Sequence, residues 1–94
     1  MKEKVLQKKV LDWLRSQPQT WAVKYHGGPY SEVGVPDVLA CVEGRFLAIE
    51  LKGAGGRVAP IQAVQIGRID KAGGVALVAY SLTDVQDAVA TMLA

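Results

Sequence analysis

The feature that most constrains this fold is a tight turn at Gly44 between two apolar segments, 37–42 and 45–52. Both segments have the length and alternation of β-strands, and a glycine in so short a connection is typical of a hairpin. A turn centred just before Gly44 pairs Asp37 with Glu50, whether the loop has two residues or four. Side chains directly opposed in an antiparallel pair lie about 5 Å apart. The hairpin therefore predicts two neighbouring carboxylates.

Hydrophobic periodicity and breakers predict the other elements. One helix is expected over 2–16, and a second begins at Pro60 and ends at the glycines 73–74. A third helix is expected to begin after a capping box formed by Ser81 and Asp84. Two further strands are expected over 21–26 and 75–80. The order is αβββαβα. The second helix crosses between two strands, which are expected to be parallel. The sequence thus predicts an α/β fold with a mixed four-stranded sheet and helices on its faces.

Side-chain composition suggests which residues form the core and excludes some sites. The only cysteine, Cys41, and the only histidine, His26, exclude an internal disulfide and a zinc site of Cys and His ligands. Cys41 lies in an apolar run and is expected in the core. Trp13 and Trp21 are also expected there, although one of them could serve a dimer contact. The continuous apolar segment 75–80 predicts a strand that is covered on both faces.

The chain of 94 residues is expected to form one domain, 1–94. Half of the residues are apolar and 21% are charged, which argues against disorder. No apolar run is long enough to span a membrane, and charges interrupt the N-terminus, so no signal peptide and a cytoplasmic location are expected. All 11 lysines and arginines lie in residues 1–71. This asymmetry is a weak indication of a polyanionic partner.

The hairpin also brings a lysine to the two carboxylates, because Lys52 lies two residues after Glu50 and points to the same face. Two carboxylates so close raise each other's pKa unless a cation lies between them. Carboxylate oxygens are ligands that Mg²⁺ prefers. Lys52 could then activate a water or stabilise the charge that develops on a phosphate. This combination indicates phosphodiester hydrolysis.

Two polar residues begin predicted helices and extend their apolar stripes. Glu3 precedes Leu6 and Val10 at helical spacing, and Gln62 precedes Ile66 and Ile69 in the same way. Such residues either point into a site between helix and sheet or meet solvent at the helix end. The two alternatives are about equal for each residue alone.

The order of these motifs resembles the virus-type replication-repair nuclease domain, VRR-NUC, within the PD-(D/E)xK nucleases. The matching motifs extend through most of the chain: Glu3, Gly34-Val35-Pro36-Asp37, Glu50-Leu51-Lys52 and Pro60-Ile61-Gln62. The resemblance implies a restriction-endonuclease-like αβββαβ core, to which this chain adds a C-terminal helix. It also implies Mg²⁺ or Mn²⁺ held by Asp37, Glu50 and the Leu51 carbonyl, with Glu3 joining through the ion or its waters.

The same resemblance implies that Lys52 is the catalytic lysine and that Gln62 orients Lys52 or the water. Stand-alone members of the family resemble Holliday-junction resolvases, which implies a homodimer that cuts branched DNA. Further DNA contacts are expected from a strand, the loop that leads to Asp37, and the segment after Lys52: Lys24, His26, Tyr30, Ser31 and Arg57. The alternative for the strand residues is an exposed edge strand.

We therefore expect a Mg²⁺- or Mn²⁺-dependent DNA endonuclease, structure-specific and dimeric. One alternative is a non-catalytic nucleic-acid-binding module on the same fold. Another is an interaction protein with no affinity for nucleic acid. The lysines near the N-terminus, Lys2, Lys4, Lys8 and Lys9, are expected to form a solvated helix face.

Overall fold

The computed structural model describes residues 1–94 and contains three helices and four strands. In chain order these are α1 (Glu3–Ser16), β1 (Thr20–Lys24), β2 (Val38–Val42), β3 (Arg45–Leu51), α2 (Pro60–Lys71), β4 (Val75–Ala79) and α3 (Leu82–Leu93). The order αβββαβα confirms the fold class predicted from the sequence. None of the three helices combines the length and apolar character needed to cross a membrane.

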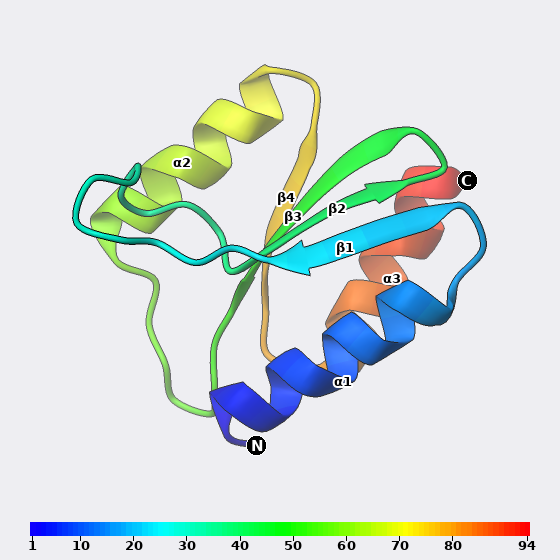
Figure 1. Ribbon diagram of the computed structural model, residues 1–94, viewed down its shortest axis with the longest axis horizontal. Coiled ribbons are helices and arrows are strands. Elements are labelled where there is room, and N and C mark those ends of the chain that lie inside the picture. Colours follow the sequence, from blue (N-terminus) through cyan, green and yellow to red (C-terminus); the bar gives the residue numbers. More distant parts are fainter.

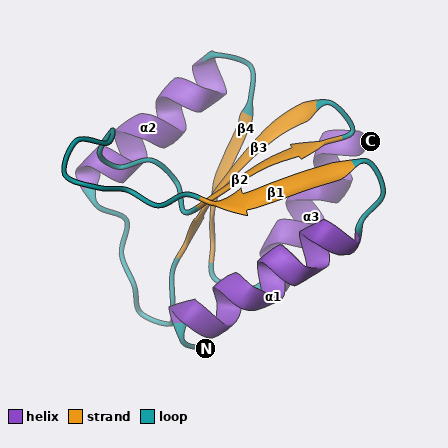
Figure 2. Cartoon of the chain, in the orientation of Figure 1, coloured by secondary structure: helices purple, strands orange, loops and turns teal.

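The four strands form one sheet in the order β1-β2-β3-β4 (Figures 1 and 2). The pairs β1–β2 and β2–β3 are antiparallel, whereas β3 and β4 are parallel and joined through α2. Val42 opposes Arg45 across a two-residue turn. Both turn residues have positive φ, 50° at Glu43 and 82° at Gly44, as a type I′ turn requires.

One face of the sheet carries the hydrophobic core. α1 and α3 lie together against this face (Figure 1), and α1 contributes Leu6, Val10 and Leu14, all fully buried. Every second residue of β2 points into the same core, as Val38 and Val42 do. Burial on this face therefore fixes the hairpin register, because a slip of one residue would expose the entire apolar set.

The opposite face is covered only in part. α2 packs over β3 and β4, and no residue of α2 is fully buried. Trp21, Cys41 and Phe46 oppose one another on adjacent strands of this face and are exposed. The predictions that Cys41 and Trp21 are core residues are therefore wrong, because no helix covers this part of the sheet. Trp13, by contrast, packs partly buried against the core.

Other differences from the sequence prediction are local. β4 is half-buried over most of its length rather than covered on both faces, because α2 shields it incompletely. β1 ends at Lys24 rather than at His26, although the Tyr25 amide still donates to the Asp37 carbonyl at 2.7 Å. The cap of α3 is confirmed: the Ser81 hydroxyl accepts a hydrogen bond from the Asp84 amide at 3.1 Å.

Candidate active site

The site is built on two carboxylates at the end of the β2–β3 hairpin. The observed register pairs Val38 with Ile49, and one step further along the strands Asp37 opposes Glu50, as the turn predicts. Asp37 Oδ2 accepts a hydrogen bond from the Leu51 amide at 2.8 Å, which holds this carboxylate against β3. Glu50 is only 2% exposed, and its Oε1 has no hydrogen-bond partner.

Two further side chains converge on Glu50 Oε2. Gln62 Nε2 donates a hydrogen bond to it at 3.1 Å, and Lys52 Nζ lies 3.5 Å from it. Gln62 also accepts, through Oε1, a hydrogen bond from the Ala59 amide at 2.8 Å, which satisfies a donor at the start of α2. Of the two alternatives for Gln62, the structure therefore shows that it points into the space between helix and sheet.

The environment of Glu50 shifts its protonation toward the neutral form. Burial raises the pKa of its carboxyl from 4.5 to about 7, and the neighbouring Asp37 adds to the rise through hydrogen bonding and charge. Lys52 acts in the opposite direction and lowers this pKa. A buried carboxylate with one bare oxygen next to a second carboxylate is the arrangement that a divalent cation would stabilise.

The side chains at this end of the β2–β3 hairpin fit a hard divalent cation. Asp37 and Glu50 supply carboxylate oxygens, and Leu51, whose carbonyl the family resemblance nominates, lies between Glu50 and Lys52 on β3. Glu3 is exposed at the start of α1, where its backbone lies beside Gly53. No cluster of three or more His, Cys, Asp or Glu residues could hold an ion, so Glu3 does not join the two carboxylates as a third ligand. A cation here would keep several waters, as Mg²⁺ usually does.

The loop that delivers Asp37 is held by α2. Gly34 has φ of +77°, and a Cβ atom there would lie 2.7 Å from the Ile61 carbonyl oxygen. Gln65 Nε2 donates to the Val33 carbonyl at 2.9 Å from the next turn of the helix. Sequence reasoning missed the positioning roles of Gly34 and Gln65. The glycine before the Val-Pro-Asp segment was the available signal, since only glycine adopts this conformation without strain.

A second loop packs against the catalytic-lysine candidate. A Cβ atom at Gly56 would lie 3.2 Å from Lys52 Cβ, so the backbone approaches the lysine stem closely. The Tyr80 hydroxyl, at the end of β4, donates to the Gly56 carbonyl at 3.2 Å. Loop residues 53–56 and Tyr80 thus restrict Lys52. Tyr80 was not identified from the sequence, because it seemed only to close an apolar strand.

Known structures share this arrangement of strands and helices. No protein-family model matches the chain, and no curated protein sequence matches it either. Two solved VRR_NUC domain proteins are similar to this chain, and each is 22% identical to it in sequence. The first match has a TM-score of 0.74 and covers 95% of this chain and 85% of the other protein. The second has a TM-score of 0.76 and covers 93% of this chain and 92% of the other protein. The chain has the fold of the VRR_NUC domain proteins.

A third solved structure extends the likeness. This structure is the Holliday junction resolvase Hjc of Archaeoglobus fulgidus, which is also 22% identical to this chain. The match covers 83% of this chain and 67% of the resolvase chain, with a TM-score of 0.62. The similarity to all three structures establishes a shared fold. In this chain, the VRR-NUC fold places Asp37, Glu50, Lys52 and Gln62 together.

The residues expected to bind DNA are scattered around this VRR-NUC site in different environments. His26, Tyr30 and Arg57 are exposed. Ser31 instead uses its hydroxyl inside its own loop, where it accepts a hydrogen bond from the Gly28 amide at 3.0 Å. Lys24 is turned toward the site, and its Nζ lies 3.5 Å from Asp37 Oδ1. No sequence pattern indicated this ion pair.

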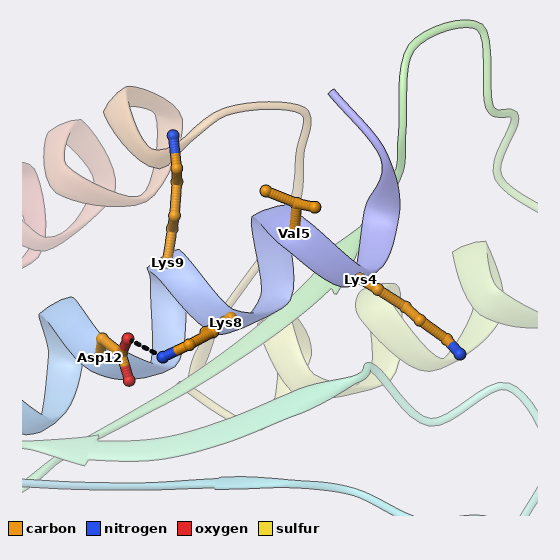
Figure 3. A pocket seen from close by; sticks show the side chains of 5 residues that line it. All are labelled: Lys4, Val5, Lys8, Lys9 and Asp12. Atoms are coloured by element: carbon orange, nitrogen blue, oxygen red, sulfur yellow. Dashed lines mark hydrogen bonds and ion pairs between the residues drawn. The ribbon is translucent and has the colours of Figure 1, made fainter.

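The N-terminal lysines lie apart from this site, on the outer side of α1. A shallow hollow there of about 430 Å³ is lined by Lys4, Val5, Lys8, Lys9 and Asp12 (Figure 3). Lys8 pairs with Asp12 one turn away at 2.7 Å, and the other two lysines extend in different directions. Val5 is the only apolar residue of this hollow, so its geometry is that of a solvated helix face, as expected.

Proposed function

We propose that this protein is a Mg²⁺- or Mn²⁺-dependent DNA endonuclease that acts on branched DNA. The observation that carries the proposal is the adjacent pair of half-buried Asp37 and buried Glu50, with an unpartnered oxygen on Glu50 and Lys52 beside it, on a VRR-NUC fold. A structural ion pair would satisfy every buried oxygen. Two adjacent acids that raise a pKa in this way are instead typical of a catalytic site.

Each residue has a role that follows from its contacts. Asp37 and Glu50 would hold the cation together with the Leu51 carbonyl, and the cation would polarise the attacking water and neutralise charge on the phosphate. Lys52 Nζ lies where it can hold a water or stabilise the negative charge that develops during attack. Gln62 holds Glu50 Oε2 in place from α2. Glu3 would act through ordered waters rather than directly.

The experiment is a cleavage assay on labelled DNA. A four-way junction, a linear duplex and a single strand are incubated with Mg²⁺, Mn²⁺ or EDTA. We expect cleavage that needs the cation and favours the junction, and no cleavage by Asp37→Asn. Asp87→Asn, which changes an exposed carboxylate on α3, is the matched control and should cleave like the wild type.

Two results would overturn parts of the proposal. Binding of the junction without cleavage in either metal would favour the alternative of a non-catalytic nucleic-acid-binding module. Absence of salt-dependent DNA binding would exclude both and would support an interaction protein, because phosphate contacts make affinity fall steeply with salt.

We also propose that the active form is a homodimer. Its support is the exposed apolar row on the sheet face that α2 leaves open, where Trp21 is 60% and Phe46 is 45% exposed. Aromatic side chains so exposed on one face of a sheet are typical of protein interfaces. Sedimentation analysis should give a dimer for the wild type and a monomer for Trp21→Glu. A monomeric wild type at micromolar concentration would refute the dimer.

A further inference from the structure

Lys24 lies beside Asp37, a carboxylate of the proposed metal site, rather than in solvent. Lys24 is the last residue of β1, and its Nζ lies 3.5 Å from Asp37 Oδ1. Both side chains are largely buried, with 27% of the lysine and 21% of the aspartate side chain exposed. The pair is therefore poorly screened by solvent, unlike the exposed pair of Lys8 with Asp12.

The oxygens of the two carboxylates are used unequally. Asp37 Oδ2 is held by the Leu51 amide, and Glu50 Oε2 is held by Gln62 with Lys52 alongside. The remaining oxygens are Glu50 Oε1, which has no hydrogen-bond partner, and Asp37 Oδ1, which lies 3.5 Å from Lys24 Nζ. A cation shared by both carboxylates would use these two oxygens, and one of them is covered by Lys24.

We propose that Lys24 is an internal counter-ion that competes with the divalent cation for Asp37 and, once displaced, contacts a DNA phosphate beside the site. This inference rests on the proposed function. A lysine and a divalent cation repel each other strongly at such separations, so both cannot share Asp37 Oδ1. Lys52 need not move, because the oxygen beside it is already bound by Gln62.

The consequence is a coupling between metal loading and DNA binding. Without the cation, Lys24 and Lys52 formally balance Asp37 and Glu50, and the site attracts phosphate weakly. With the divalent cation added, the site as a whole carries excess positive charge, and Lys24 is free to contact the DNA backbone. The lysine stem is flexible and its ammonium is a mobile point charge, which suits such an exchange of partners.

The test compares Lys24→Met with Lys8→Met. Methionine keeps the apolar stem and removes the charge, and Lys8 supplies a matched control because its ion pair is exposed and lies away from Asp37. The first readout is Mn²⁺ affinity without DNA, from the electron paramagnetic resonance signal of free Mn²⁺. Lys24→Met should bind Mn²⁺ about three- to tenfold more tightly than the wild type. Lys8→Met should bind it unchanged.

The second readout is the salt dependence of junction binding in EDTA and in Ca²⁺. A plot of log affinity against log salt concentration has a negative slope, and loss of one phosphate contact makes this slope shallower by about 0.9. Lys24→Met should show that loss in Ca²⁺ and no change in EDTA. Circular dichroism at equal temperature checks that both variants are folded.

The measurements distinguish failure of the counter-ion proposal from failure of the proposed nuclease function. If the wild type binds Mn²⁺ but Lys24→Met binds it equally or more weakly, the counter-ion proposal is wrong and the nuclease proposal stands. An equal loss of salt slope in EDTA and in Ca²⁺ would also refute it, because Lys24 would then contact DNA without release. If the wild type binds no Mn²⁺ at all, the proposed function itself fails.

Discussion

The buried carboxyl of Glu50 should make the metal-free protein less stable at neutral pH than a variant without its charge. Burial raises the pKa of this carboxyl from its ordinary value of 4.5 to about 7 in the folded protein, a difference equivalent to about 3 kcal/mol. Because the folded pKa is the higher one, the folded state gains from the proton at low pH. This gain is complete below about pH 4.5 and is lost as the pH rises through 7.

Glu50→Gln keeps the shape and removes the ionisation. Its amide can donate toward Asp37, while its carbonyl oxygen can accept from Gln62 as Glu50 Oε2 does. In EDTA at pH 8, the variant should therefore unfold with a free energy about 2–3 kcal/mol above that of the wild type. The advantage should shrink by about 2 kcal/mol at pH 5, where the folded wild type holds the proton.

Urea unfolding followed by tryptophan fluorescence measures this difference. Asp87→Asn, an exposed carboxylate on α3, is the control and should change the free energy of unfolding by less than about 0.5 kcal/mol at both pH values. The reasoning is refuted if Glu50→Gln is less stable than the wild type at pH 8. It is equally refuted if the difference between the two proteins is the same at pH 5 and pH 8.

Three further substitutions test the parts that surround the carboxylates. Gly34→Ala should lower the free energy of unfolding by about 2–4 kcal/mol, because the new Cβ would meet the Ile61 carbonyl and φ is positive; a loss below about 0.5 kcal/mol in urea unfolding would contradict this. Gln62→Leu should slow cleavage about tenfold or more while DNA affinity is kept, since Glu50 loses its donor; unchanged single-turnover rates would argue against a positioning role. Lys52→Met should lower the single-turnover rate by about 10²–10³ with little change in DNA affinity, and a wild-type rate would exclude the role given to Lys52.

The sequence predicted the hairpin register because local chemistry decides it. Gly44 favours a two-residue turn with positive φ, and the alternation of β2 and β3 leaves one register in which the apolar side chains share a face. The adjacency of Asp37 and Glu50 follows from that register alone. This is why the centre of the candidate site could be predicted without any knowledge of the tertiary structure.

The misplaced residues depend on contacts that are distant in sequence. Their apolar character and local sequence placed Trp21 and Cys41 in the core, but neither could reveal that α2 leaves their face of the sheet open. Glu3 and Gln62 gave the same signal as polar starts of apolar stripes. They differ in what faces them, because α2 packs on β3 and brings Gln62 to the buried carboxylate of Glu50. This contact depends on tertiary packing and is not visible in the sequence.

A crystal of the wild-type protein soaked in Mn²⁺ would test the central claim most directly. Anomalous scattering locates the ion without reference to activity. The account predicts a peak within ligand distance of Asp37 and Glu50, absent from crystals of Asp37→Asn. An ordered site with no peak at saturating Mn²⁺, or a peak only at other side chains, would contradict it.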